Sequence, residues 1–373
     1  MKKTRIRIGA VLLALAASPV FAGDDVFEFF KEEAMVYTAS RRPESAWHTP
    51  VAVDVVTAEE IKAYGYSSLA DILRFRAGMD VLDGRSADGN RAIVSARGFT
   101  RDFASEMQVL VDGRSVYSPF LGGVYWESMP VQIQDIARVE IVRGPNAALY
   151  GSNAALGVIN IITRKPGPRS GGSVSARGGN RSAAAAESAE AGGRLGGVRV
   201  SHSYREMPGN PAASGVGDAN DFFHSNKLNL RARLTPNSAT ELEFMGGGSW
   251  QTIGVPGFPV DTRAKHEQDF QLLRVERDLE SAGAVEASLA RSELRLGLDR
   301  FLAAPVDIRV YQYDAEVLHR SAWLEERVHS AVGASWRLSG LYSDQLFAGH
   351  PAQQNRVVRG FTHHSAQLAD SLT

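Results

Sequence analysis

The chain has 373 residues, of which 22% are charged, with a formal net charge of −1 and no cysteine. This length allows two or more domains, and the lack of cysteine excludes disulfides, thiol nucleophiles and thiolate metal sites. The sequence has no apolar run long enough to cross a bilayer as a helix, but membrane-spanning strands need only about ten alternating residues each.

The first 22 residues have the pattern of a signal peptide. Basic residues precede a short apolar stretch over residues 8–17, and Val20-Phe21-Ala22 predicts cleavage after Ala22. Four of the 41 basic residues would be removed, leaving 37 against 42 acidic ones. A mature chain with that acidic balance argues against nucleic acid as a partner.

The beginning of the mature chain predicts a strand and two helices. Residues 50–57 alternate apolar and polar side chains, as a strand does. Thr57 fits the start of a helix over residues 58–64, which Gly65 would end. A second helix is expected to begin after Ser67 or Ser68 and to run to Phe75.

Two loops interrupt the strands that follow. Residues 83–91 are rich in Gly, Asp, Asn and Ser, which predicts an exposed loop. Strands are expected over residues 92–96 and 108–114, the second ending in an Asp-Gly turn. Residues 118–127 form the second predicted loop. The aromatic residues in and beside it, Tyr117, Phe120, Tyr125 and Trp126, allow two interpretations, as exposed loop residues or as core residues.

Residues 136–163 predict a strand, a glycine-rich turn and a second, buried strand. Three short motifs in this stretch are more specific. They are residues 142–145 (Val-Arg-Gly-Pro), 149–151 (Leu-Tyr-Gly) and 157–163 (Gly-Val-Ile-Asn-Ile-Ile-Thr). This stretch closely resembles the signature that closes the plug domain of TonB-dependent outer-membrane receptors. A phosphate-binding Walker A loop is excluded, because no Gly-Lys-Ser/Thr follows the glycines.

The resemblance implies a globular plug inside a barrel of about 22 strands in the outer membrane. It implies uptake of a scarce nutrient such as a ferric siderophore, haem or cobalamin, bound as a small molecule or metal chelate. The partners would be TonB, with its inner-membrane energising complex, and outer-membrane lipid, and not nucleic acid. No catalytic or metal-binding constellation is recognisable, so we expect no enzyme activity, no metal site and no cofactor.

The resemblance also implies roles for individual residues. TonB would bind a short segment near the mature N-terminus by strand addition, which tolerates side-chain variation. The candidates for this TonB box are Glu33, Ala34, Met35, Val36, Tyr37 and Thr38. Candidate ligand contacts at the plug apices are Arg85, Asp88, Asn90, Tyr117, Phe120, Tyr125 and Trp126. Arg97 and Arg143 match plug arginines that pair with barrel glutamates, which the sequence does not locate.

Beyond Arg164 the sequence alternates in the manner of outer-membrane strands. Short turns are expected to alternate with long loops near residues 207–225, 249–265, 297–306 and 342–355. A soluble β-sandwich is the alternative, with loops of similar length at both ends. The remaining length allows roughly ten strands, too few to enclose a plug, because plugged lumens occur near 22 strands.

The predicted fold class is therefore an α+β plug domain followed by antiparallel transmembrane strands in an incomplete, open barrel of about ten strands. The expected domains are residues 1–22 (signal peptide), 23–46 (N-terminal extension with the TonB box), 47–165 (plug) and 166–373 (partial barrel). We expect the chain to be the N-terminal half of a nutrient receptor. Alternatives are a non-transporting ligand-binding or signalling module in the periplasm or at the cell surface, and a small independent barrel.

Overall fold

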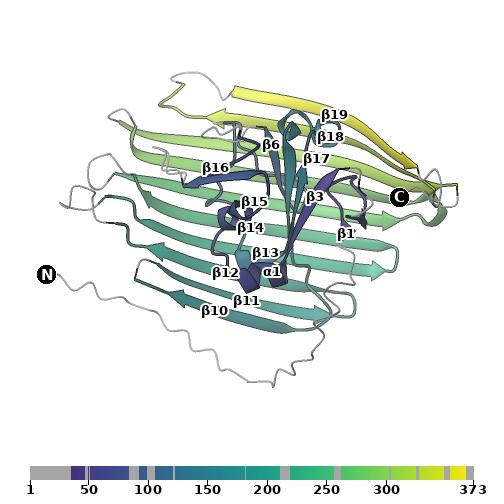
Figure 1. Ribbon diagram of the computed structural model, residues 1–373, viewed down its shortest axis with the longest axis horizontal. Coiled ribbons are helices and arrows are strands. Elements are labelled where there is room, and N and C mark those ends of the chain that lie inside the picture. The colour runs from purple at the N-terminus through teal and green to yellow at the C-terminus, as the bar shows by residue number, and fades with distance from the viewer. Residues whose placement is uncertain are drawn as a thin grey trace.

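The computed structural model describes residues 35–366 except 47–48, 50, 84–91, 99–105, 121, 181, 211–218, 256–261, 302–303, 325–326 and 348–352. The predicted signal peptide, Glu33, Ala34 and the loop with Arg85, Asp88 and Asn90 lie outside the described residues. Two parts stand out in Figure 1, a large meandering sheet and a smaller domain that lies over one of its faces.

The large sheet has ten antiparallel strands, each paired with the next along the chain, and is not closed into a barrel. We call it the barrel sheet. Its strands are β10 (Gly171–Gly178), β11 (Ala183–Gly193), β12 (Gly196–Met207), β13 (Phe223–Asn237), β14 (Thr240–Gly254), β15 (Arg263–Asp278), β16 (Ala284–Phe301), β17 (Ala304–Trp323), β18 (Val328–Tyr342) and β19 (Gln353–Ala366). The predicted open sheet of about ten strands is confirmed.

Alternation along the strands gives the barrel sheet two chemically different faces. On β13, Lys227 and Arg231 reach the smaller domain, Lys227 through a hydrogen bond from Nζ to the Val131 carbonyl (3.2 Å). Leu228 and Leu230 between them remain exposed, because successive side chains of a strand point to opposite faces. One face is therefore polar where it meets the smaller domain, and the other carries apolar side chains outward.

The long connections lie at one end of the barrel sheet, with one departure from prediction. Residues 208–222, 255–262 and 343–352 connect strands, but β16 and β17 are separated by only residues 302–303. The long loop expected over residues 297–306 is therefore wrong. Leu298 pairs with Val306 and both are buried, so burial extends the two strands through the segment that the sequence had suggested as a loop.

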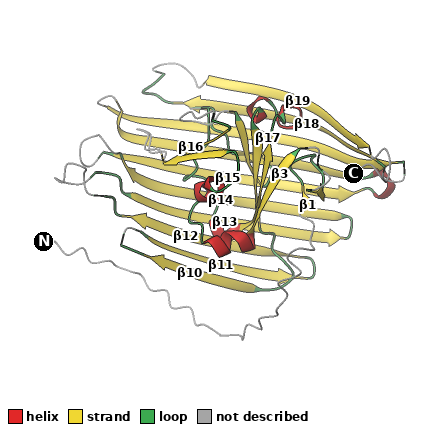
Figure 2. Cartoon of the chain, in the orientation of Figure 1, coloured by secondary structure: helices red, strands yellow, loops and turns green. Residues whose placement is uncertain are grey.

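The smaller domain, which we call the plug, is built from the elements between residues 52 and 163. They are β3 (Ala52–Thr57), α1 (Ala58–Tyr64), α2 (Leu69–Arg74), β4 (Met79–Asp83), β5 (Ala92–Ala96), β6 (Met107–Val111), β7 (Arg114–Ser115), β8 (Ile136–Arg143), α3 (Ala147–Tyr150) and β9 (Gly157–Thr163), with 3-10 turns at Ile133–Asp135 and Ser152–Ala154. A further 3-10 turn, Glu280–Ala282, precedes β16. The few helices lie mainly in the plug (Figure 2), and no helix in the described part of the chain is long and apolar enough to cross a membrane.

Five strands of the plug form one mixed sheet in the order β3-β8-β9-β6-β7. Strands β6 and β9 are parallel, whereas the other neighbours are antiparallel. The predicted strand pair of the signature stretch corresponds to β8 and β9, which lie side by side at the centre. The turn between them contains α3, a short helix that the sequence did not predict.

The helix boundaries follow the capping residues. The Thr57 hydroxyl accepts a hydrogen bond from Glu60 N (3.2 Å), and Gly65 ends α1 in the left-handed conformation (φ 66°). Ser68, rather than Ser67, caps α2 by accepting from Asp71 N (3.1 Å). Because Asp112 and Gly113 both have positive φ (50° and 82°), the expected Asp-Gly turn joins β6 to β7.

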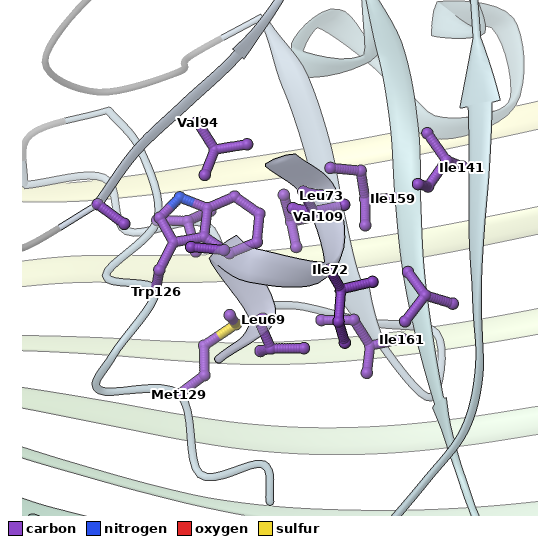
Figure 3. Packing of buried hydrophobic residues seen from close by; sticks show 14 of the residues in the cluster. Leu69, Ile72, Leu73, Val94, Val109, Trp126, Met129, Ile141, Ile159 and Ile161 are labelled. Atoms are coloured by element: carbon purple, nitrogen blue, oxygen red, sulfur yellow. The ribbon is translucent and has the colours of Figure 1, made fainter. Parts of the chain in front are cut away.

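The plug core lies between α2 and the sheet (Figure 3). Leu69, Ile72 and Leu73 of α2 are buried against residues of β6 and β9, including Val109 and Ile161. Trp126 and Met129 close the same core from the loop that follows β7. This packing buries one face of the plug sheet and holds α2 against it.

Candidate functional site

The chain segment before the plug is held between the plug and the barrel sheet. Strand β1 (Met35–Val36) pairs antiparallel with β2 (Glu44–Ser45), and the turn between them returns the chain to the plug. Val36 is 1% exposed and Thr38 is fully buried. We call residues 35–46 the N-terminal segment.

A buried carboxylate of the plug holds this segment. One oxygen of Glu140 accepts hydrogen bonds from Tyr37 N (3.0 Å), Thr38 N (2.8 Å) and Thr38 Oγ1 (2.5 Å). The other oxygen accepts from Arg138 Nε (2.8 Å). Glu140 is fully buried, and a buried charge is tolerated only with such partners. The charged carboxylate therefore makes the N-terminal segment part of the plug.

Thr38 is the centre of the contact. Its hydroxyl donates to Glu140 and accepts from Asn160 Nδ2 (3.1 Å), while its carbonyl accepts from the Tyr150 hydroxyl (3.0 Å). Burial raises the pKa of Tyr150 to about 12, which keeps that hydroxyl protonated and able to donate. The three plug side chains thus fix Thr38 through both its side chain and its backbone.

The barrel sheet holds the other side of the segment. Arg320 Nη1 of β17 donates to the Tyr37 hydroxyl (2.9 Å) and pairs with Glu286 of β16 (3.0 Å). Arg41, which adopts a positive φ of 62°, makes an ion pair with Glu316 of β17. Burial raises the pKa of the Tyr37 hydroxyl above its usual value, so it stays neutral. The segment is consequently held between plug and barrel. We call these contacts of Tyr37, Thr38 and Arg41 the clamp.

A second group of ion pairs joins the plug directly to the barrel. Arg231 of β13 contacts Asp112 of the plug (3.3 Å), donates to the Thr163 carbonyl (2.8 Å) and pairs with Glu243 of β14 (2.9 Å). Arg199 of β12 pairs with plug Asp135 (2.8 Å). In these two contacts the arginine belongs to the barrel and the carboxylate to the plug.

A cavity of about 800 Å³ lies beside the clamp, and we call it the interior cavity. Its wall combines the N-terminal segment, plug elements β6 to β9, and barrel strands β13 and β15 to β19. Nine basic and five acidic residues line it, so its wall is cationic. The described residues contain no cluster of His, Asp and Glu suited to a metal ion.

Comparisons with known proteins identify the two parts. Residues 45–158 match the family model of the TonB-dependent receptor plug domain. The vitamin B12 transporter BtuB of Photobacterium profundum is 36% identical over 180 residues, which is 48% of this chain and 28% of the transporter. The iron-regulated outer membrane virulence protein of Vibrio cholerae is 34% identical over 149 residues, 38% of this chain and 22% of that protein.

Solved structures extend the likeness into the barrel sheet. The siderophore receptor PirA of Pseudomonas aeruginosa superposes with a TM-score of 0.64 at 20% identity, covering 85% of this chain and 53% of PirA. The alcaligin receptor FauA of Bordetella pertussis gives 0.61 at 18% identity, covering 90% of this chain and 63% of FauA. The chain thus spans little more than half the length of these structures.

The chain belongs to the TonB-dependent receptor family. Its ten antiparallel strands correspond to part of the receptor barrel, and its family places it in the outer membrane.

Of the predicted TonB box, Met35 to Thr38 are described in this receptor, and they lie in the clamp rather than free. Sequence reasoning did not single out the residues that hold them there. A signal existed, because Glu140 and Asn160 each lie between two apolar neighbours in their strands, and they pair directly across β8 and β9. A charge within a buried strand needs partners, and here the partners are Arg138 and the N-terminal segment.

The candidate ligand aromatics of the receptor are not one exposed group. Trp126 belongs to the plug core, and Tyr125 packs edge-on against His266 in a cluster with barrel residues. That cluster also contains Leu294, Leu296, Val306, Ile308 and Val310. We expected ligand contact from aromatic side chains that are exposed in a loop. Tyr125 and Trp126 are buried, so this reason does not apply to them. Tyr117 and Phe120 are only half-buried.

The two plug arginines do not make the expected contacts in the described part of the receptor. Arg97 is exposed, with a positive φ of 56°, and Arg143 donates to the Ala77 carbonyl within the plug (3.2 Å). Neither pairs with a glutamate among the described barrel residues. Arg41, Arg199 and Arg231 make the ionic contacts instead, because they lie where the polar face of the barrel sheet meets the plug and its N-terminal segment.

Proposed function

We propose that the chain serves in energised uptake of a scarce nutrient across the outer membrane, with TonB acting on residues 33–38. The observation that carries this proposal is the clamp around Tyr37 and Thr38, which links the N-terminal segment to the central plug strands through Glu140. A force on the segment would reach β8 directly. A free N-terminal tail could not transmit it in this way.

The clamp would also allow the N-terminal segment to leave the plug and to bind to it again. Strand β1 has only two residues, so little main-chain pairing opposes its withdrawal. TonB would add a strand to the released segment through main-chain hydrogen bonds. The hydrogen bonds to Glu140 would then determine how readily the segment leaves, since bonds to a charged group contribute about 1.5–3 kcal/mol each.

For the ligand we propose a small molecule or metal chelate of the kind named for the relatives, a cobalamin or a ferric siderophore. We propose Arg85, Asp88, Asn90, Tyr117 and Phe120 as its contacts. The proposed domains remain residues 23–46, 47–165 and 166–373 after a signal peptide of 22 residues. The plug match over residues 45–158 and the end of β9 at Thr163 support the middle boundaries.

Proline at position 36 is the direct test of the TonB contact. In a receptor that transports, Val36→Pro removes one main-chain donor from the added strand and should strongly reduce uptake. Ligand binding to isolated outer membranes should be unchanged. Val36→Ala, which keeps the donor, is the matched control. Normal uptake by the proline variant would reject the TonB role of this segment.

The nutrient can be found with growth assays. A strain lacking other receptors, supplied with a single cobalamin or iron source, should grow only on the transported nutrient when the gene is present. Fractionation of the same cells addresses the alternative function. Recovery of the protein from the soluble periplasm, with no growth benefit from any nutrient, would favour a ligand-binding or signalling module.

The half-buried aromatics give a narrower prediction. Replacing Tyr117 and Phe120 together by Ala should weaken ligand binding by roughly tenfold or more, because aromatic side chains dominate recognition at low entropic cost. Binding of the identified nutrient to outer membranes measures this. Tyr64→Ala, an exposed aromatic on α1, is the control. Equal affinity in the double variant would assign both residues to packing.

A further inference from the structure

The interior cavity contains a buried cation without a matching anion. Arg114 of β7 is 4% exposed, and its Nη1 donates to Ser292 Oγ of β16 (2.9 Å). Its guanidinium lies 4.2 Å from the centre of the Phe270 ring. Among the described residues, its Nη2 has no hydrogen-bond partner and no carboxylate forms an ion pair with it. A buried charge in that state is costly.

The carboxylate with the strongest influence on Arg114 is already occupied. Asp314 of β17 pairs with Arg337 Nε (2.6 Å) and accepts from Gln312 Nε2 (2.7 Å). Arg359 of β19 lines the same cavity, and its Nη1 donates a hydrogen bond to the Tyr150 carbonyl (3.3 Å). The side of the cavity around Asp314 therefore holds more guanidinium groups than carboxylates.

We propose that the interior cavity binds an oxyanion, a carboxylate or phosphate group, through the guanidinium groups of Arg114 and Arg359. Guanidinium groups bind such anions through paired, charge-assisted hydrogen bonds. Arg114 and Arg359 both line the cavity, and the buried Nη2 of Arg114 has no hydrogen-bond partner among the described residues. Burial lowers the pKa of Arg114 to about 10, as expected of a guanidinium that lacks a counter-ion. The inference is independent of the identity of the transported nutrient.

Citrate and inorganic phosphate are suitable probes, with the 373-residue chain in detergent. Each probe should raise the thermal unfolding midpoint of the protein above the midpoint in sodium chloride of equal ionic strength. A ligand that binds the folded state stabilises that state. Arg114→Gln should weaken the response by roughly ten- to a hundredfold in apparent affinity. Arg177→Gln, at an exposed position on β10 outside the cavity, should respond as the parent does.

A second readout separates binding from structure. Without citrate or phosphate, Arg114→Gln should leave the midpoint unchanged or raise it, because it removes an unpaired buried charge. If the variant does not fold, Arg359→Gln provides the same test and should also weaken the response. A midpoint that rises equally in chloride, or a full anion response in Arg114→Gln or Arg359→Gln, would overturn the proposal. A response to only one probe would identify the carboxylate or phosphate as its source.

Discussion

Trp126→Ala is expected to lower the free energy of unfolding of the plug by about 3–5 kcal/mol, the usual cost of truncating a buried tryptophan. Trp126 is 5% exposed and packs with Met129 against the α2 core. The urea concentration at which the plug loses protease resistance should fall accordingly. Ligand affinity at low denaturant should persist, since the indole faces the core.

Trp323→Ala is the matched control, because Trp323 is 58% exposed on β17. It should change the urea midpoint little. The opposite pattern, an unchanged midpoint with lost ligand affinity for Trp126→Ala, would restore the earlier interpretation of this residue as a ligand contact.

Glu140→Ala is expected to release the N-terminal segment. The substitution leaves Tyr37 N, Thr38 N, the Thr38 hydroxyl and Arg138 without their shared acceptor. Breaking a buried, hydrogen-bonded charge pair costs about 3–5 kcal/mol. The open state of the segment should become more populated by roughly a hundredfold or more.

Thiol labelling can measure that opening, because the chain has no cysteine of its own. In a Val36→Cys background the thiol should react slowly, and adding Glu140→Ala should accelerate it by the same factor. Glu140→Gln keeps the shape of the side chain and one acceptor oxygen, so its labelling rate should lie between those of the two other proteins. Glu59→Ala on exposed α1 is the control. Equal labelling rates with and without Glu140 would show that other contacts hold the segment.

Local rules predicted much of the fold. The caps at Thr57 and Gly65 fix α1 because they depend on a few neighbouring residues. The alternation around Leu228 and Leu230 identified β13 because one face of the strand is apolar from Leu228 to Leu234. The open sheet followed from chain length and strand period, which do not depend on tertiary contacts.

The residues of the site depended on contacts that the sequence does not encode locally. Trp126 lies among prolines and glycines, so its neighbours suggested a loop, and only packing against distant strands buries it. The pairing of Asp112 with Arg231 joins residues 119 positions apart, and many arginines on the barrel strands had the same local pattern. Glu140 could have been singled out, since it lies between Val139 and Ile141 and a buried charge needs partners. Its contact with Thr38, however, joins residues 102 positions apart.

The position of β9 in the plug sheet has a consequence for folding order. This strand lies between β8 and β6, yet it is the last plug strand to be synthesised. The parallel pairing of β6 with β9 cannot be complete until residue 161 is present, and non-local pairings of this kind slow folding. Only residues 164–170 separate β9 from β10. The plug sheet therefore cannot be completed until synthesis has nearly reached the first barrel strand.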